Sequence, residues 1–288
     1  MRVTLVRALV LLTAVALLSA CRREAPVPTG FVMEPARPGN TGTDASPLFT
    51  IQLEPQPAAL QELATHSIDV EDPVYRRPKR YEGFRLSEVV ERLAPARASL
   101  GDDAHLVLVC RDGYRAPLTM RLARGGGNIL AKRDRDAAAT WEQLPSGTAV
   151  KTPAPFYLVW EPSARADGRE RPWPYGVVAI EVWLADPADR AKPSRTGDGI
   201  ARGYDVFKQK CINCHRVNGA GGALASELNT PANVTEYWNP LALRQFILNP
   251  ASIRAESKMP RLTGLAEHEV DAVLEYLESM KYQKLVVK

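Results

Sequence analysis

Two cysteines and a histidine in the last third of the chain have a spacing that suits covalent chemistry on a porphyrin. Cys211 and Cys214 lie three residues apart, and His215 follows directly. Two thiols on one helical turn can each add to a vinyl group of the same porphyrin, and the adjacent imidazole then reaches the iron. The spacing therefore predicts one covalently attached haem c, with His215 as a ligand of its iron.

A cysteine pair with this spacing also occurs in zinc sites and in thioredoxin-like redox proteins. A zinc site would need two more nearby cysteine or histidine ligands, and downstream of the motif only His268 is present. A thioredoxin-like redox pair would need a strand before the motif, whereas residues 201–210 have the pattern of a helix. Both interpretations are therefore disfavoured.

Three helices are expected to hold the motif in place. The first, residues 201–210, leads into it and carries a small residue at an expected close crossing. Asn239 can cap the second helix, which Pro240 begins. The third covers residues 267–280, without a hydroxyl side chain at its cap. The expected core-facing positions are Gly203, Phe207, Leu243, Phe246, Ile247, Val270, Val273, Leu274 and Leu277.

Residues 199–288 are expected to form one all-α domain, of which about 199–285 resembles a small class I cytochrome c. The resemblance assigns Met259 as the second iron ligand, opposite His215. A thioether suits ferrous iron and raises the reduction potential relative to ligation by two histidines. Met280 is a rival, but it falls on the apolar stripe of the last helix, and His268 is a weaker one on an exposed side. A Met259 that only fills space in a loop or core stays the alternative.

Two features near the haem are left open by this resemblance. Members of the family often have a Gly-Pro-x-Leu segment whose proline carbonyl orients the iron-bound imidazole, but here residues 225–228 read Ala-Ser-Glu-Leu. The acceptor of the second ring proton of His215 is therefore not assigned, although one is expected. Tyr237 and Trp238 either wall the haem crevice or belong to the plain core.

Basic residues cluster in sequence around Met259. Arg254, Lys258 and Arg261 surround it, and Arg216 follows the haem motif. They predict either a basic rim that steers an acidic redox partner or a merely solvated surface. The net charge over residues 199–288 is only +2, from 11 basic and 9 acidic side chains, so both interpretations stand.

The start of the chain resembles the signal peptide of a bacterial lipoprotein. Two arginines precede an uncharged run of 14 residues, 8–21, which is shorter than the ~18 that a membrane-spanning helix needs. Leu-Ser-Ala-Cys at 18–21 resembles a lipobox, which implies removal of residues 1–20 and lipid on Cys21. The alternative is an ordinary signal peptide with an incidental cysteine. The proline-rich residues 21–47 are expected to form a disordered tether to a membrane, on its periplasmic side.

Residues 48–185 are expected to form a second domain, joined to the cytochrome-like one by a polar linker at 186–198. Strand-like stretches outnumber the single clear helix at 86–93, so this domain is predicted to be mixed α+β. The expected strands are 48–53, 105–110, 114–119, 156–161 and 176–184.

Short phrases within residues 65–184 resemble the sulfite-oxidase-like molybdopterin-binding fold. In catalytic members of that family a cysteine thiolate binds molybdenum; Cys110 lies near that place but is offset, and Cys-x-Gly-Asn-Arg is absent. Strand alternation makes Cys110 a buried, unreactive thiol by default. The basic residues Arg76, Arg77, Lys79 and Arg80 fit a phosphate clamp or a solvated turn. The phrases that carry the resemblance are Asp72–Tyr75, Tyr81–Phe84, Asp112–Tyr114 and Trp173–Tyr175.

Two hypotheses follow for the whole protein. It is either a lipid-tethered carrier of single electrons with a cofactor-free docking or structural module, or a molybdopterin-dependent oxidoreductase that passes electrons to its own haem. The missing metal thiolate favours the carrier and leaves open whether the chain is an enzyme. With 45% apolar residues and a net charge of +4, the 288-residue chain is neither wholly disordered nor a multi-span membrane protein. The charge gives no support for nucleic-acid binding.

Overall fold

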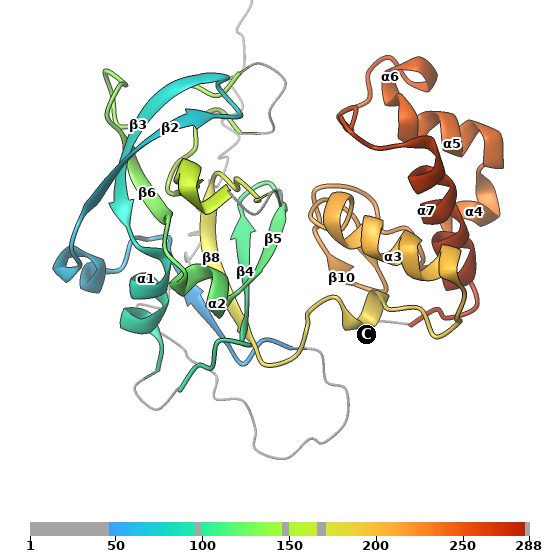
Figure 1. The fold of residues 1–288 in the computed structure, drawn as a ribbon, viewed down its shortest axis with the longest axis horizontal. Helices are drawn as coiled ribbons and strands as arrows, with labels where there is room; N and C mark the ends of the chain where they lie inside the picture. Colours follow the sequence, from blue (N-terminus) through green and yellow to red (C-terminus); the bar gives the residue numbers. More distant parts are fainter. Residues whose placement is uncertain (1–45, 96–98, 146–149, 166–170, 286–288) are drawn as a thin grey trace, which may run out of the picture. The chain divides into compact units, whose positions relative to one another are not determined.

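A computed structural model describes residues 46–95, 99–145, 150–165 and 171–285 (Figure 1). All of the described residues belong to one compact unit of the chain. Cys21 and the predicted signal peptide lie outside the described residues, so the prediction of a lipid anchor is not tested by the fold.

The β-rich region holds two antiparallel sheets of four strands each (Figure 1). The first has the order β1-β8-β4-β5 and the second the order β2-β3-β6-β7. The strands of the first sheet are β1 (Phe49–Gln52), β8 (Val177–Trp183), β4 (His105–Cys110) and β5 (Arg115–Thr119). Those of the second are β2 (His66–Asp72), β3 (Arg77–Phe84), β6 (Asn128–Asp134) and β7 (Tyr157–Trp160).

One apolar core joins the two sheets and two helices. Alternate residues of β4, Leu106 and Leu108, are buried in it together with Leu158 and Trp160 of β7. Helices α1 (Leu86–Leu93) and α2 (Met120–Arg124) contribute their apolar sides to the same cluster. Burial of this apolar surface stabilises the sheets on each other. The described residues also include three short 3-10 helices: Ala58–Glu62, Pro162–Arg165 and Asp189–Ala191.

The C-terminal region is helical. Its core is formed mainly by α3 and α7, supported by α5, and a two-stranded ribbon of β9 and β10 follows the cysteine motif. The helices are α3 (Asp198–Lys210), α4 (Val234–Tyr237), α5 (Pro240–Leu248), α6 (Pro250–Ile253) and α7 (Glu267–Met280). The ribbon strands are β9 (Arg216–Val217) and β10 (Ala220–Gly221).

Helices α3 and α7 cross so closely that only a glycine fits at the contact. A Cβ atom on Gly203 would lie 2.0 Å from the carbonyl oxygen of Ala272. The rings of Tyr204 and Phe207 pack against Tyr276 beside this point, with centroids 5.5 and 5.3 Å apart. The expected close crossing at Gly203 is therefore present, and it fixes the helix that leads into the cysteine motif.

The predicted linker, 186–198, is attached to the helical region along part of its length. Ala188 and Ala191 are buried in the helical core. Tyr204 donates a hydrogen bond from its hydroxyl to the carbonyl of Ala188 (3.2 Å), and Tyr276 donates one to the carbonyl of Ala191 (2.7 Å). Within the described ranges, no helix combines the length and apolar character that crossing a bilayer requires.

Candidate haem site

The two cysteines and the histidine lie on a single turn that follows α3. The backbone N–H of Cys211 donates to the carbonyl of Phe207 at 2.9 Å, which closes the helix. The N–H groups of Cys214 and His215 both donate to the carbonyl of Cys211, at 3.1 and 2.9 Å. One turn therefore carries both thiols and the imidazole, as the spacing predicts.

Both thiols are free and half-buried. Burial is the main cause that raises the pKa of Cys211 to about 12 and that of Cys214 to about 11. At neutral pH the pair is therefore protonated, and each S–H can add across a vinyl group. The thiols form no disulfide in the described structure.

His215 is held by a backbone carbonyl. Its Nδ1 lies 2.9 Å from the carbonyl oxygen of Ser226. A carbonyl oxygen can only accept, so Nδ1 carries the proton and Nε2 has its lone pair free for a metal. Burial lowers the pKa of His215, against the effect of the Ser226 bond, and so favours the neutral ring. Ser226 is the acceptor that the sequence left unassigned, and it stands where the family pattern has proline.

The rivals for the second iron ligand differ in burial. Met259 is half-buried in the loop between α6 and α7, where its N–H donates to the Ser257 hydroxyl at 3.2 Å. Met280 is fully buried in the helical core, so packing accounts for it. His268 is exposed on the first turn of α7. The assignment of Met259 stays a prediction.

The aromatic pair at the end of α4 lies at the surface of the helical region. Tyr237 is 59% exposed, and the half-buried Trp238 packs on Phe246 with ring centroids 5.1 Å apart. Arg254 stacks over Trp238 at 4.8 Å. Neither aromatic ring is enclosed as a plain core residue would be.

A family model described as Cytochrome c matches residues 200–281. Residues 200–281 are a cytochrome c domain. The match covers 82 of the 288 residues, so it assigns this domain and not the β-rich region. A search of curated proteins found no match to the chain.

The cytochrome c domain implies covalent haem c, electron transfer through that haem, redox protein partners and an extracytoplasmic location. The residues present fit the cofactor, because two free thiols and a neutral imidazole with an available Nε2 share one turn. Haem c attaches through cysteine thiols and takes a histidine on its proximal side.

The loop between β4 and β5 hydrogen-bonds to the attachment turn of the cytochrome c domain. Asn213, which lies between the two cysteines, donates from its side chain to the Tyr114 hydroxyl at 2.8 Å. The backbone N–H of Arg115 donates to the Asn213 carbonyl at 2.9 Å, and that of Ala223 donates to the Gly113 carbonyl at 2.7 Å. Gly113 has φ +92°, and a Cβ there would lie 2.9 Å from the Ala223 carbonyl carbon.

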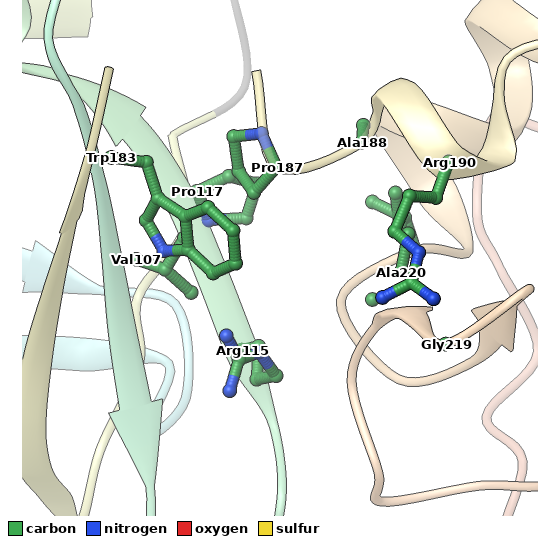
Figure 2. A pocket seen from close by; sticks show the side chains of 11 residues that line it. Val107, Arg115, Pro117, Trp183, Pro187, Ala188, Arg190, Gly219 and Ala220 are labelled. Carbon is green, nitrogen blue, oxygen red and sulfur yellow. The ribbon is translucent and has the colours of Figure 1, made fainter. Parts of the chain in front are cut away.

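A small cavity adjoins these bonds (Figure 2). Its volume is about 60 Å³, and Figure 2 shows Arg115 and Trp183 on one side with Arg190 and Ala220 facing them. A space of this size holds a few water molecules and is far smaller than a substrate or cofactor pocket. The cavity therefore offers no second cofactor site.

Cys110 has the surroundings that strand alternation predicts. It is buried at the end of β4, in the apolar core that Leu106 and Leu108 also line. Burial raises its pKa far above the ordinary range of a thiol, so the thiolate form is disfavoured. These surroundings are those of a structural thiol rather than of a metal ligand.

Three of the four basic residues at 76–80 form ion pairs, and these three also line an open surface hollow together with Asp69, Glu71 and Asp136. Lys79 is fully buried and pairs with Asp134 and Glu142. Arg77 pairs with Glu142, and Arg80 pairs with Asp136. Since these cations already have carboxylate partners, the arrangement favours a structural role over a phosphate clamp.

Sequence reasoning missed Ser226, Asn213 and Tyr114 as site residues. The Ser226 bond uses a backbone carbonyl, which leaves no mark on residue type. Asn213 occupies a variable place in the motif, and its contact comes from a loop 99 residues away. A polar residue between the two cysteines was the only available signal.

Proposed function

We propose that the protein is a lipid-tethered monohaem cytochrome that carries single electrons between redox proteins at the periplasmic side of a bacterial membrane. The observation that supports this best is the attachment turn, which presents both thiols while the Ser226 carbonyl holds the imidazole in the metal-binding tautomer. A bound haem supplies a one-electron iron couple.

Each residue of the site has a distinct part in this proposal. Cys211 and Cys214 would hold the porphyrin through thioether bonds, and His215 and Met259 would be the ligands of its iron. Thioether ligation favours the reduced iron and so sets a comparatively high potential. Binding and orienting the haem are the tasks of the chain; no proton transfer is assigned to it.

Residues 48–185 form, in this proposal, a docking or structural module for the cytochrome c domain. The bonds from Gly113, Tyr114 and Arg115 to the attachment turn support that role. The buried Cys110 thiol argues against the alternative, a molybdopterin-dependent oxidoreductase that reduces its own haem. The role of the module does not depend on a cofactor of its own.

The electron partner is proposed to be acidic. Arg254, Lys258 and Arg261 are all exposed near Met259, and none forms an ion pair within the described ranges. Exposed, unpaired cations attract an acidic surface over a Debye length of roughly 10 Å at 0.1 M salt. Electron exchange with such a partner would slow as salt is raised.

Metal content per chain is the test of this function. The full chain, produced in cells that mature cytochromes c and supply molybdopterin, is expected to contain about one iron and no molybdenum. Both metals near one per chain would instead establish the molybdenum enzyme, and a chain without iron would refute the proposal. Elemental analysis of the purified protein gives both numbers.

The lipid anchor has its own test. Cys21→Ser is expected to release the protein from membranes, because two or more acyl chains are needed for stable attachment and serine accepts none. Membrane and released fractions are compared by immunoblot. Cys110→Ser is the matched cysteine control and should stay with the membrane. Continued membrane association of Cys21→Ser would contradict lipidation at that residue.

A further inference from the structure

The Glu227 carboxylate joins the two backbone segments that carry His215 and its acceptor. Its Oε1 accepts hydrogen bonds from the N–H groups of Asn218 (2.9 Å) and Asn229 (3.0 Å), and its Oε2 accepts one from Gly219 (2.9 Å). Asn218 and Gly219 form the turn between β9 and β10 at φ +54° and +78°. Consecutive N–H groups in such a turn make a concave site for an anion.

Glu227 is close in the sequence to His215, the proposed iron ligand, and to the residue whose carbonyl holds the His215 ring. Glu227 directly follows Ser226, whose carbonyl accepts from His215, and the turn it binds begins three residues after His215. Two backbone bonds keep the same segments aligned: Ala225 N–H to the Cys214 carbonyl (2.9 Å) and Leu228 N–H to the Arg216 carbonyl (2.8 Å). The carboxylate adds three bonds to these two, and two of the three are to the turn that joins β9 to β10.

We propose that Glu227 is a positioning residue for His215. The inference rests on the proposed function, since it takes His215 as the iron ligand. By tying the β9–β10 turn to the Ser226 segment, Glu227 keeps the Ser226 carbonyl on the Nδ1 proton. That bond makes the imidazole a stronger donor to iron and favours the ferric state. Ser226 is exposed, so water replaces the bond when the segment moves away.

The test uses the haem-loaded full chain and the variant Glu227→Ala. Three backbone N–H groups lose their acceptor in this variant, so the segment loosens. Exchange of the His215 Nδ1 proton with solvent, followed by NMR of the reduced protein, is expected to speed up roughly tenfold, the effect of one weakened hydrogen bond. The midpoint potential is expected to rise.

Two further variants separate positioning from charge and from stability. Glu227→Gln removes the charge but keeps the oxygen that serves Asn218 and Asn229, so Nδ1 proton exchange should fall between the wild type and Glu227→Ala. Glu269→Ala removes an equal charge at the start of α7, where its carboxylate accepts from the Ala266 N–H at 2.8 Å. Exchange at His215 should stay unchanged there.

The role of Glu227 is supported if the rate of Nδ1 proton exchange is lowest in the wild type, intermediate in Glu227→Gln and highest in Glu227→Ala. An unchanged exchange rate in both variants overturns it, even if the potential rises equally in both, because charge alone then accounts for that rise. If Glu227→Ala does not fold, an unchanged rate in Glu227→Gln overturns it alone. A wild-type chain without histidine-ligated haem would refute the proposed function instead, before any variant is made.

Discussion

A chain with both Cys211 and Cys214 replaced by serine is expected to contain no covalent haem. Each thiol supplies one thioether bond, and a hydroxyl does not add to a vinyl group under the same conditions. The two residues share one turn, closed by bonds to the Cys211 carbonyl, so serine fits without rearranging the backbone. Haem staining after denaturing electrophoresis, with intact mass, should show a fall from one haem per chain to none.

The third cysteine of the described residues provides the matched control. Cys110 is buried in the β-rich core, away from the attachment turn in the sequence and bonded to no porphyrin in the proposal. Cys110→Ala should therefore keep one covalent haem, at a cost in stability of about 1 kcal/mol for a small cavity. Covalent haem in the double serine variant, or its loss in Cys110→Ala, would contradict the assignment.

Met259→Ala is expected to lower the midpoint potential and to abolish the absorption band of methionine-ligated ferric haem. The thioether stabilises ferrous iron, and its loss leaves the position to water or to a nitrogen ligand. Axial ligands set haem potentials over roughly 0.8 V, so the shift should be well outside the error of an optical redox titration. The covalent haem itself should remain.

Met280→Leu is the control for this variant. Met280 is fully buried at the end of α7, and leucine nearly conserves its volume, so the change should cost less than about 1.5 kcal/mol and leave the spectrum unaltered. If instead Met280→Leu loses the methionine band while Met259→Ala keeps it, Met280 is the ligand.

The three longer helices of the C-terminal region could be predicted from the sequence because their signals are local, whereas the short helices α4 and α6 and the β9–β10 ribbon were not predicted. The last helix was expected at 267–280 and is observed at Glu267–Met280. It has no hydroxyl cap, as expected, and Glu269 supplies the other half of a capping box by accepting from the Ala266 N–H. Asn239 caps α5 as expected, accepting from the N–H groups of Leu241 and Ala242.

In the β-rich half, five expected strands correspond to β1, β4, β5, β7 and β8, but β2, β3 and β6 were not predicted. These three strands carry charged residues on a face that is buried, such as Lys79 in β3 and Asp134 in β6. Asp72 at the end of β2 accepts from the Tyr81 hydroxyl at 2.7 Å. In the sequence, the residues of a buried ion pair are of the same types as those of an exposed turn. Residue type therefore predicts a surface turn where the structure has a buried strand.

The candidate haem site also has residues that the sequence identifies and residues that only the fold assigns. Side-chain chemistry with fixed spacing identified Cys211, Cys214 and His215, and the family pattern pointed to residues 225–228. The acceptor for His215 depends on a carbonyl that every residue has, so only the fold assigns it to Ser226. Contacts between segments distant in sequence, such as Tyr114 with Asn213, have no local signal at all.

The glycine crossing of α3 and α7 also bears on the order in which the domain is made. Gly203 and Ala272 are 69 residues apart, so the helix before the cysteines finds its support only after the far end of the domain has been synthesised and exported. Until then the attachment turn belongs to a chain without its packed core. Haem attachment at this stage would take place before α7 packs against α3.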